Sequence, residues 1–273
     1  MQNALITGIA VAIMCSVIGL FLVLRKHSLF GDALSHMAFG GVALGLYLNV
    51  YPLWTAFMVS IVSAIGITKL RQSTKIPSDA SVAVLLSAGL ATGIVLVSAS
   101  KGFTTDLFSL LFGSILLVSL QEMAMIVALS IATLCIMLLL FKKFMYITFD
   151  EEQAKISGLQ VSMLNYLFIT LASITVIASI RLVGILLISS LIVLPNITAM
   201  MFGKGFKKTA IISGLIAVIS VISGIIISYL ANLAPGGTIV LVSVAIFIGT
   251  WLAKSITRRY TTTISATTTS STM

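Results

Sequence analysis

Apolar runs of about 20 residues, separated by short segments that carry charge, proline or glycine, occupy almost the whole chain. A helix of that length crosses a bilayer, and it satisfies its own backbone hydrogen bonds where no water is available. The sequence therefore predicts an all-α, polytopic membrane helix bundle with about nine transmembrane helices. The predicted spans are 4–24, 34–50, 53–70, 80–99, 121–141, 164–180, 183–202, 209–230 and 237–253.

The scarcity of charge excludes whole classes of protein. Charged residues make up 8% of the 273 residues and hydrophobic residues 59%, against roughly 25% and 45–50% in a soluble domain. A soluble enzyme, a disordered chain and a disulfide scaffold are therefore excluded. The net charge of +9 need not indicate nucleic acid, because Lys and Arg of membrane proteins collect in cytoplasmic loops. We expect contact with membrane lipid and none with nucleic acid.

The basic residues also predict the orientation. If the N-terminus lies outside, all of the 16 Lys and Arg residues except Lys101 and Arg181 fall on the cytoplasmic side. We therefore expect a multi-pass protein of the cell membrane with the N-terminus outside and the C-terminus in the cytoplasm. The first apolar run is expected to be a retained span and not a signal peptide. Eight spans remain possible if a pair is re-entrant, and 103–115 is too short and polar to span.

The domain organisation is expected to be simple. Residues 1–256 form one transmembrane domain, which includes an acidic cytoplasmic segment at about 149–160 that can form a short surface helix. Residues 257–273 are rich in Ser and Thr and lack apolar periodicity, which predicts a disordered tail.

Asp32 and His36 are the candidate metal ligands. Ionisable residues within a span are costly and are usually functional, and a spacing of four places both side chains on one face of a helix. A carboxylate and an imidazole suit a divalent transition metal, although a second copy of the chain or water must complete the site. In the alternative interpretation, Asp32 caps the helix and His36 is a satisfied buried histidine.

Two glycine pairs predict close helix contacts, Gly41 with Gly45 and Gly89 with Gly93, because small residues four apart let helices approach closely. The sequence contains no nucleotide-binding loop of the Gly-x-x-x-x-Gly-Lys-Ser/Thr type and no His-Glu-x-x-His motif. The chain therefore binds no nucleotide through such a loop of its own.

Four ordered blocks resemble one known family. Residues 31–36 read Gly-Asp-Ala-Leu-Ser-His and 40–45 read Gly-Gly-Val-Ala-Leu-Gly, which closely resembles the second-helix signature of the manganese/zinc/iron ABC-transporter permeases (the ABC-3 type). Residues 106–116, 149–159 and 183–199 resemble three further blocks, and the resemblance extends over about 2–253. One departure is Gly40, where members of the family usually carry proline.

The resemblance implies a type II-like ABC importer permease and not an enzyme. It implies a pair of identical subunits, separate ATP-binding cassette subunits and an extracellular metal-binding protein. The transported ion would be manganese, zinc or iron, with no permanently bound cofactor. The resemblance implies that Asp32 and His36 contact the metal. It also implies that five residues within 149–160 couple the permease to the ATPase. These residues are Asp150, Glu151, Glu152, Ala154 and Gly158.

Two other functions stay open on the residues alone. One is a secondary carrier for a small solute that is driven by an ion gradient, but the spans hold few ionisable residues for ion coupling. The other is an intramembrane enzyme, which would need a nucleophile and base or a metal set beyond Asp32 and His36.

Overall fold

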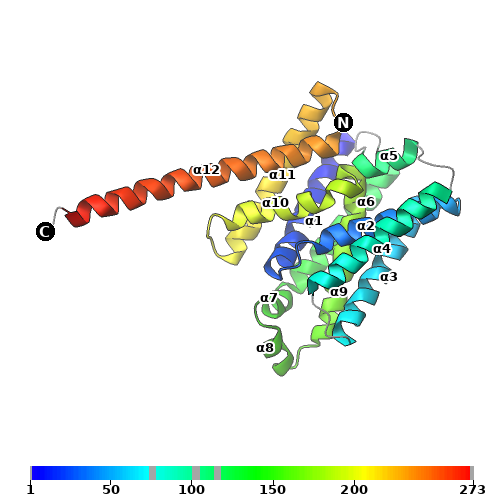
Figure 1. Cartoon of the computed structure of the whole chain (residues 1–273), viewed down its shortest axis with the longest axis horizontal. Helices are drawn as coiled ribbons and strands as arrows, with labels where there is room; N and C mark the ends of the chain where they lie inside the picture. Colours follow the sequence, from blue (N-terminus) through cyan, green and yellow to red (C-terminus); the bar gives the residue numbers. More distant parts are fainter. Residues whose placement is uncertain (1, 74–77, 100–104, 114–117, 271–273) are drawn as a thin grey trace.

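The computed structural model describes residues 2–73, 78–99, 105–113 and 118–270, with the side chains of 70–73, 78–79, 105–108 and 256–270 excepted. Every regular element in these ranges is a helix (Figure 1), which confirms the predicted all-α class. The helices are α1 (Gln2–Leu24), α2 (Phe30–Tyr47), α3 (Pro52–Ser73), α4 (Ser78–Ala99), α5 (Thr105–Phe112), α6 (Leu120–Leu139), α7 (Phe141–Phe149), α8 (Glu151–Ile156), α9 (Val161–Val183), η2 (Ile185–Leu187), α10 (Ile188–Met200), α11 (Phe206–Ala231) and α12 (Pro235–Ser270).

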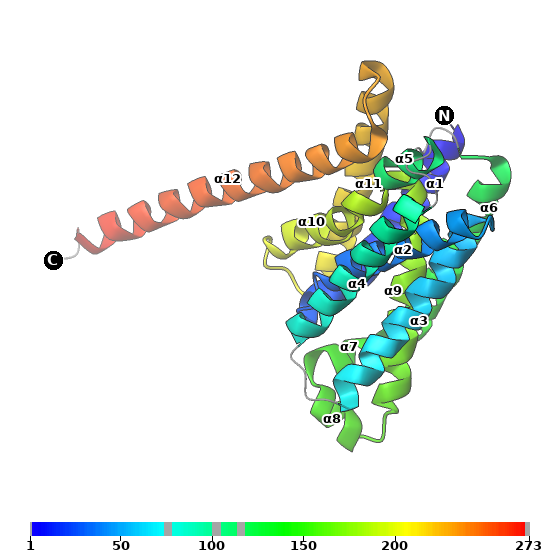
Figure 2. The same cartoon turned by 45° about the vertical axis from the view of Figure 1, so that its right-hand side comes forward.

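In the described part of the chain, seven helices are long and apolar enough to cross a membrane, namely α1, α3, α4, α6, α9, α11 and α12. The two other predicted spans form the shorter or more polar helices α2 and α10. The expected number of nine therefore corresponds to seven long helices and two others that run beside them. Figure 2 shows α2, α3 and α4 side by side, and α2 packs closely against both neighbours.

The predicted span 183–202 differs from the structure. The chain breaks at Gly184 (φ 84, ψ 159) and forms η2 before α10 begins at Ile188. Few residues other than glycine adopt this backbone conformation, so Gly184 allows the sharp joint. The predicted piece at 103–115 contains α5, whose eight residues are too short to cross a bilayer. Residues 103–104 and 114–115 lie outside the described part.

The bundle has two distinguishable ends. The α5 end contains α5, the connection between α2 and α3, the start of α6 and the end of α9. The α8 end contains α7, α8, the end of α1 and the start of α11. A cluster of aromatic rings, which we call the phenylalanine cluster, connects α1, α7, α9 and α11 at the α8 end. Its ring centroids lie 5.4–6.2 Å apart. Its members are Phe21, Phe141, Phe144, Phe149, Phe168 and Phe206.

The α5 end is packed backbone against backbone. A side-chain carbon at Gly184 would overlap the carbonyl of Leu111, and one at Gly236 would overlap the carbonyl of Val183. At Gly113 such a carbon would lie 2.8 Å from the carbonyl oxygen of Leu182. The joints of α5, α9 and α12 therefore leave no room for side chains at these glycines.

Helix α12 leaves the bundle beside the loop between α10 and α11, where the Lys254 ammonium donates to the carbonyl of Met201. The helix extends to Ser270 (Figure 1). The tail expected from residue 257 falls on residues whose side chains are not described, and its disorder stays a prediction.

Candidate functional site

The structure brings the predicted pair together at the start of α2. Asp32 is the third residue of the helix, and His36 follows one turn later. The His36 Nε2 atom lies 3.9 Å from the Asp32 Oδ1 atom, and the two side chains are 15% and 26% exposed. The predicted common face is therefore present, and both side chains are partly exposed.

The structure shows neither of the hydrogen bonds that the alternative interpretation of this pair would use. The N-cap residue of α2 is Leu29, and no side chain caps this helix end. The His36 Nδ1 atom is buried without a hydrogen-bond partner. Because a buried polar atom without a partner is costly, His36 is not a satisfied core histidine.

Close contact with α4 fixes the backbone of α2 at His36. A side-chain carbon at Gly89 would lie 2.6 Å from the carbonyl carbon of His36, and one at Gly93 would overlap the ring of Phe39. On the other side, a carbon at Gly41 would lie 2.6 Å from the Cα atom of Ala56 on α3. The glycine pairs therefore make the close helix contacts that the sequence predicted, and α2 packs between α3 and α4.

Gly40, where proline is usual in the family that the sequence resembles, lies in a close contact with α4. Helix α2 continues without a break from Phe30 to Tyr47. A side-chain carbon at position 40 would lie 2.8 Å from the Thr92 Oγ1 atom and 3.1 Å from the Gly89 carbonyl oxygen. A larger residue here would push α4 away from the turn that holds His36.

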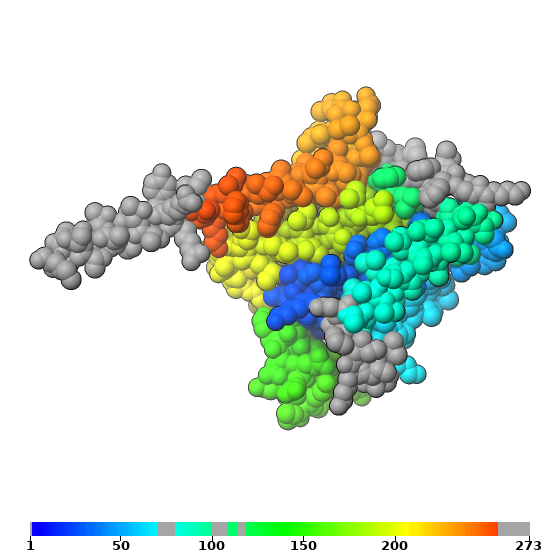
Figure 3. All heavy atoms as spheres, in the orientation of Figure 1, coloured from blue at the N-terminus to red at the C-terminus, as the bar shows by residue number. Residues whose placement is uncertain are grey.

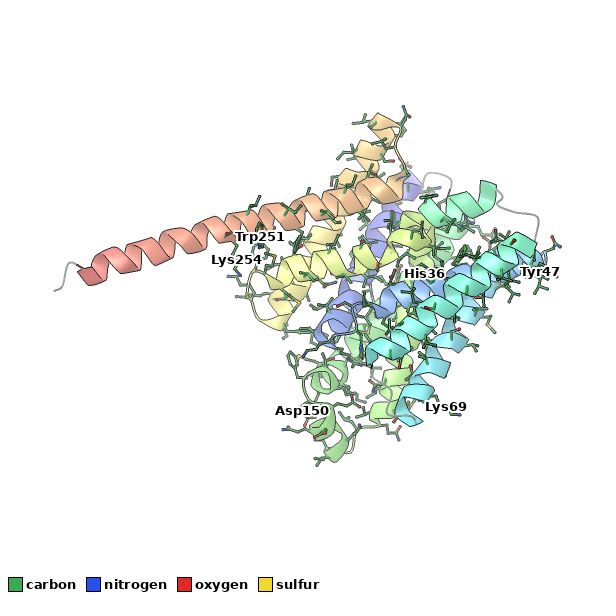
Figure 4. All side chains as sticks on the ribbon, viewed as in Figure 1. His36, Tyr47, Lys69, Asp150, Trp251 and Lys254 are labelled. Carbon is green, nitrogen blue, oxygen red and sulfur yellow. The ribbon has the colours of Figure 1, made fainter. Side chains whose placement is uncertain are left out.

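The described part of the chain brings only two candidate metal ligands together. Among the described residues, no group of three or more His, Cys, Asp or Glu side chains could hold a metal. Figure 4 shows His36 on α2 within the bundle. Figure 3 shows the blue N-terminal part of the chain at the surface between the yellow-green α10 and the blue-green α4. Within the described residues, Asp32 and His36 therefore have no third donor of these types beside them.

The acidic segment at 149–160 forms the short helix α8. The Asp150 carboxylate caps it by accepting the backbone N–H of Gln153 at 2.9 Å, so this acid has a local structural task. Ala154 is fully buried, which anchors α8, and Gly158 turns the chain with φ 79.

The outer face of α8 is left to solvent. The Glu151 carboxylate lies 3.0 Å from the Lys155 ammonium, and Glu152 is exposed. Ile156 is 85% exposed although it is apolar. The outer face of α8 therefore combines an exposed apolar side chain with three charged ones.

The contacts of Arg25 were not predicted, because in the sequence this residue is one of many basic loop residues. The Nε atom donates to the Thr148 Oγ1 atom and Nη1 donates to the Asn165 Oδ1 atom, both at 2.9 Å. The guanidinium lies 4.6 Å from the ring centroid of Phe168. Burial lowers the pKa of Arg25 to about 10, although the negative charge of Glu151 acts in the opposite direction.

Sequence reasoning also missed the partner of Arg181. Its Nη2 atom lies 2.6 Å from the Glu122 Oε1 atom, and Tyr51 donates to the same oxygen at 3.1 Å. Ser119 and Glu122 form a capping box at the start of α6. The ion pair joins α6, α9 and the connection between α2 and α3. No local pattern could have revealed it, because Glu122 and Arg181 are 59 residues apart.

Comparisons with known proteins agree with this arrangement. The model of the ABC 3 transport family matches residues 1–254. A probable metal transport system membrane protein from Treponema pallidum is 35% identical over 247 residues, which cover 90% of this chain and 92% of that protein. The manganese transport system membrane protein MntC from Listeria monocytogenes is 34% identical over 90% of this chain and 88% of that protein.

A solved structure resembles the fold as a whole. The structure of PsaBC from Streptococcus pneumoniae in complex with Fab matches with a TM-score of 0.82 and 34% identity, and the match covers 92% of this chain and 90% of that chain. The relatives are membrane components of metal transport systems, so the chain is a transport permease and not an enzyme. The chain therefore belongs to the ABC 3 transport family, as a multi-pass membrane permease of a metal ABC transporter.

Proposed function

We propose that this chain is the permease subunit of an ATP-driven importer for a divalent transition metal ion, and that Asp32 and His36 contact the metal in transit. One observation carries the assignment. The buried Nδ1 atom of His36 has no partner in a turn that also holds a carboxylate. An imidazole with an unpaired nitrogen, whose other nitrogen faces a carboxylate, supports binding of a ligand at this turn.

The donor chemistry supports this class of ion. Imidazole nitrogen suits transition metals, whereas magnesium and calcium prefer oxygen alone. A two-fold pair of chains would supply two carboxylates and two imidazoles. Such a site selects without holding the ion permanently, as transport requires. Manganese is the first candidate because the Listeria relative is named for it, and zinc and iron accept the same donors.

The basic residues support an orientation with the α8 end in the cytoplasm and the N-terminus outside. Lys142 and Lys143 neighbour one member of the phenylalanine cluster, Lys207 and Lys208 follow another, and Lys254 lies beside the loop before α11. Such a concentration of cations is typical of the cytoplasmic side. In this orientation the extracellular metal-binding protein would approach the α5 end.

The ATP-binding cassette subunit would dock on α8. Asp150 and Ala154 hold this short helix in place, Gly158 ends it, and Glu152 and Ile156 are exposed. Glu151 is half exposed, because it pairs with Lys155 at the surface and also lines the cavity beside Arg25. A partner surface would cover Ile156, which is otherwise an exposed apolar side chain in water.

The first experiment tests the metal contact. Asp32→Ala and His36→Ala, each in the transporter assembled with its ATP-binding subunits, should lower manganese uptake into membrane vesicles at least about tenfold. Leu44→Ile on the same helix is the matched control and should transport normally. Normal manganese uptake by either alanine variant would contradict the metal contact. Uptake by the unaltered transporter that survives ATP depletion would favour a secondary carrier instead.

The second experiment tests the docking surface. Reversing both charges with Glu151→Lys and Glu152→Lys should reduce co-purification of the ATP-binding subunit, because the substitutions place repulsive charges at the contact and at a helix N-terminus. Lys143→Glu reverses a charge on the neighbouring helix and should leave co-purification unchanged. Equal recovery of the subunit with the doubly reversed variant and the unaltered chain would refute the assignment.

A further inference from the structure

Arg25 stands at a rigid corner between α1 and α2. The backbone N–H of His27 donates to the Leu22 carbonyl at 2.8 Å, and that of Lys26 donates to the Val23 carbonyl at 3.0 Å. With Lys26 in the left-handed region (φ 57), these bonds form a Schellman motif that ends α1. Helix α2 begins three residues after His27, and the N–H of Phe30 donates to the His27 carbonyl at 3.0 Å. The turn that carries Asp32 is therefore linked to Arg25 through hydrogen-bonded backbone.

The side chain of Arg25 reaches across to the coupling segment. It donates to Thr148 at the end of α7, two residues before Asp150 caps α8, and to Asn165 on α9. The Phe168 ring beneath the guanidinium adds a cation–π contact. A single side chain thus connects the α1–α2 corner with the helices on both sides of α8.

The charge of Arg25 is only partly matched in this arrangement. Both of its hydrogen-bonded partners are neutral, and its buried Nη2 atom has no partner. A cavity of about 360 Å³ adjoins the guanidinium, and Glu151 of α8 lines the same cavity. An unpaired guanidinium nitrogen and a carboxylate therefore share one space, without forming an ion pair within 4.0 Å in the part of the chain that is described.

We propose that Arg25 is a positioning residue for transport, which passes movement of the coupling segment 149–160 to the turn of α2 that holds Asp32 and His36. The inference rests on the proposed function and adds the link between its two sites. In the arrangement seen here, Arg25 holds Thr148 and Asn165. When the ATP-binding subunit displaces α8, Glu151 pairs with Nη2, and the rigid corner moves with the guanidinium.

The geometry requires a planar, branched cation. The two bonds to Thr148 and Asn165 use Nε and Nη1, and the pair with Glu151 uses Nη2. A lysine ammonium cannot reach three partners in these directions. Arg25→Lys should therefore behave like Arg25→Gln, which distinguishes positioning from a mere need for positive charge.

The test measures manganese transported per ATP hydrolysed, in vesicles that contain the full transporter and its extracellular binding protein. Arg25→Gln and Arg25→Lys should lower this ratio about tenfold, a typical size for coupling between sites, while ATP hydrolysis continues. Thr148→Val removes one contact at constant volume and should lower the ratio by a smaller factor. Lys143→Gln is the control for lost charge at the same end and should leave the ratio unchanged.

The ratio separates positioning from simple loss of folded protein, because a destabilised transporter loses transport and hydrolysis together. An unchanged ratio in both Arg25→Gln and Thr148→Val would overturn the inference while the proposed function stands. A ratio restored by Arg25→Lys would also overturn it. Absence of ATP-dependent manganese uptake by the unaltered transporter would overturn the proposed function and the inference with it.

Discussion

The two ends of the bundle are built differently around their turns. At the α5 end, Gly184 and Gly236 lie against backbone carbonyls with no room for a side chain. At the α8 end, Gly158, Gly203 and Gly205 have nothing within 4 Å of the space that a side-chain carbon would occupy. Glycine therefore serves close packing at one end and an open turn at the other.

The half-buried arginines at the two ends also differ in the partners of their charge. Arg181 at the α5 end pairs with a carboxylate that a tyrosine and a capping box also hold. Arg25 at the α8 end binds neutral partners and keeps a buried nitrogen free of hydrogen bonds. The Nε atom of Arg181 is also buried without a partner, but its charge is already paired with Glu122. The charge of Arg25 has no such pair, and Glu151 lies across the cavity that both residues line. The comparison teaches that the α5 end is fixed and that the α8 end can rearrange.

The largest expected effect comes from placing the same substitution at both ends. Gly184→Ala and Gly158→Ala both put a side chain at positive φ (84 and 79), but only the first meets the Leu111 carbonyl. We expect Gly158→Ala to cost about 1 kcal/mol of stability from the backbone alone. Gly184→Ala should cost more than about 3 kcal/mol, because the clash is added. Melting temperatures in detergent check this, and equal losses would break the comparison.

A middle-sized effect is expected at the ion pair. Glu122→Gln or Arg181→Gln alone should each cost about 2 kcal/mol, which is less than for a fully buried pair because both side chains are 21% exposed. The double variant should cost less than the sum of the two, since neither charge is left alone. Denaturation of the single and double variants measures this coupling. Additive losses would show that Glu122 and Arg181 do not stabilise each other.

The smallest expected effect on stability is at Lys26, in the corner beside Arg25. Lys26 holds a left-handed conformation (φ 57) at the end of α1, where glycine is usual. Lys26→Gly should therefore raise stability by up to about 1 kcal/mol. A small rise in melting temperature would verify the motif, and a fall would show that the Lys26 side chain contributes more than its backbone costs.

Much of this arrangement could be predicted because its signals are local. Long apolar runs indicate the helices, and glycines four residues apart indicate where α2 meets α3 and α4. The spacing of Asp32 and His36 places them on one face without any tertiary information. The break at Gly184 was missed because the apolar run continues through it, and only the backbone conformation of one residue interrupts the helix.

The contacts that join distant helices could not be predicted. Arg25 meets Thr148 and Asn165 across 123 and 140 residues. Nothing in the residues around Arg25 distinguishes it from the many basic residues that stay in water. Burial of one cation is decided by how the helix ends pack, and that depends on the whole bundle. The same holds for the Arg181 pair.

The phenylalanine cluster has a mechanical consequence. Phe21 on α1 touches rings from α7, α9 and α11, and most of these contacts are edge-to-face. Each such ring pair contributes about 1 kcal/mol beyond its buried area, so sliding one helix past the others would forfeit several pairs at once. These four helices are expected to travel as a single body. Helix α8, which contributes no ring to the cluster, lies outside this body.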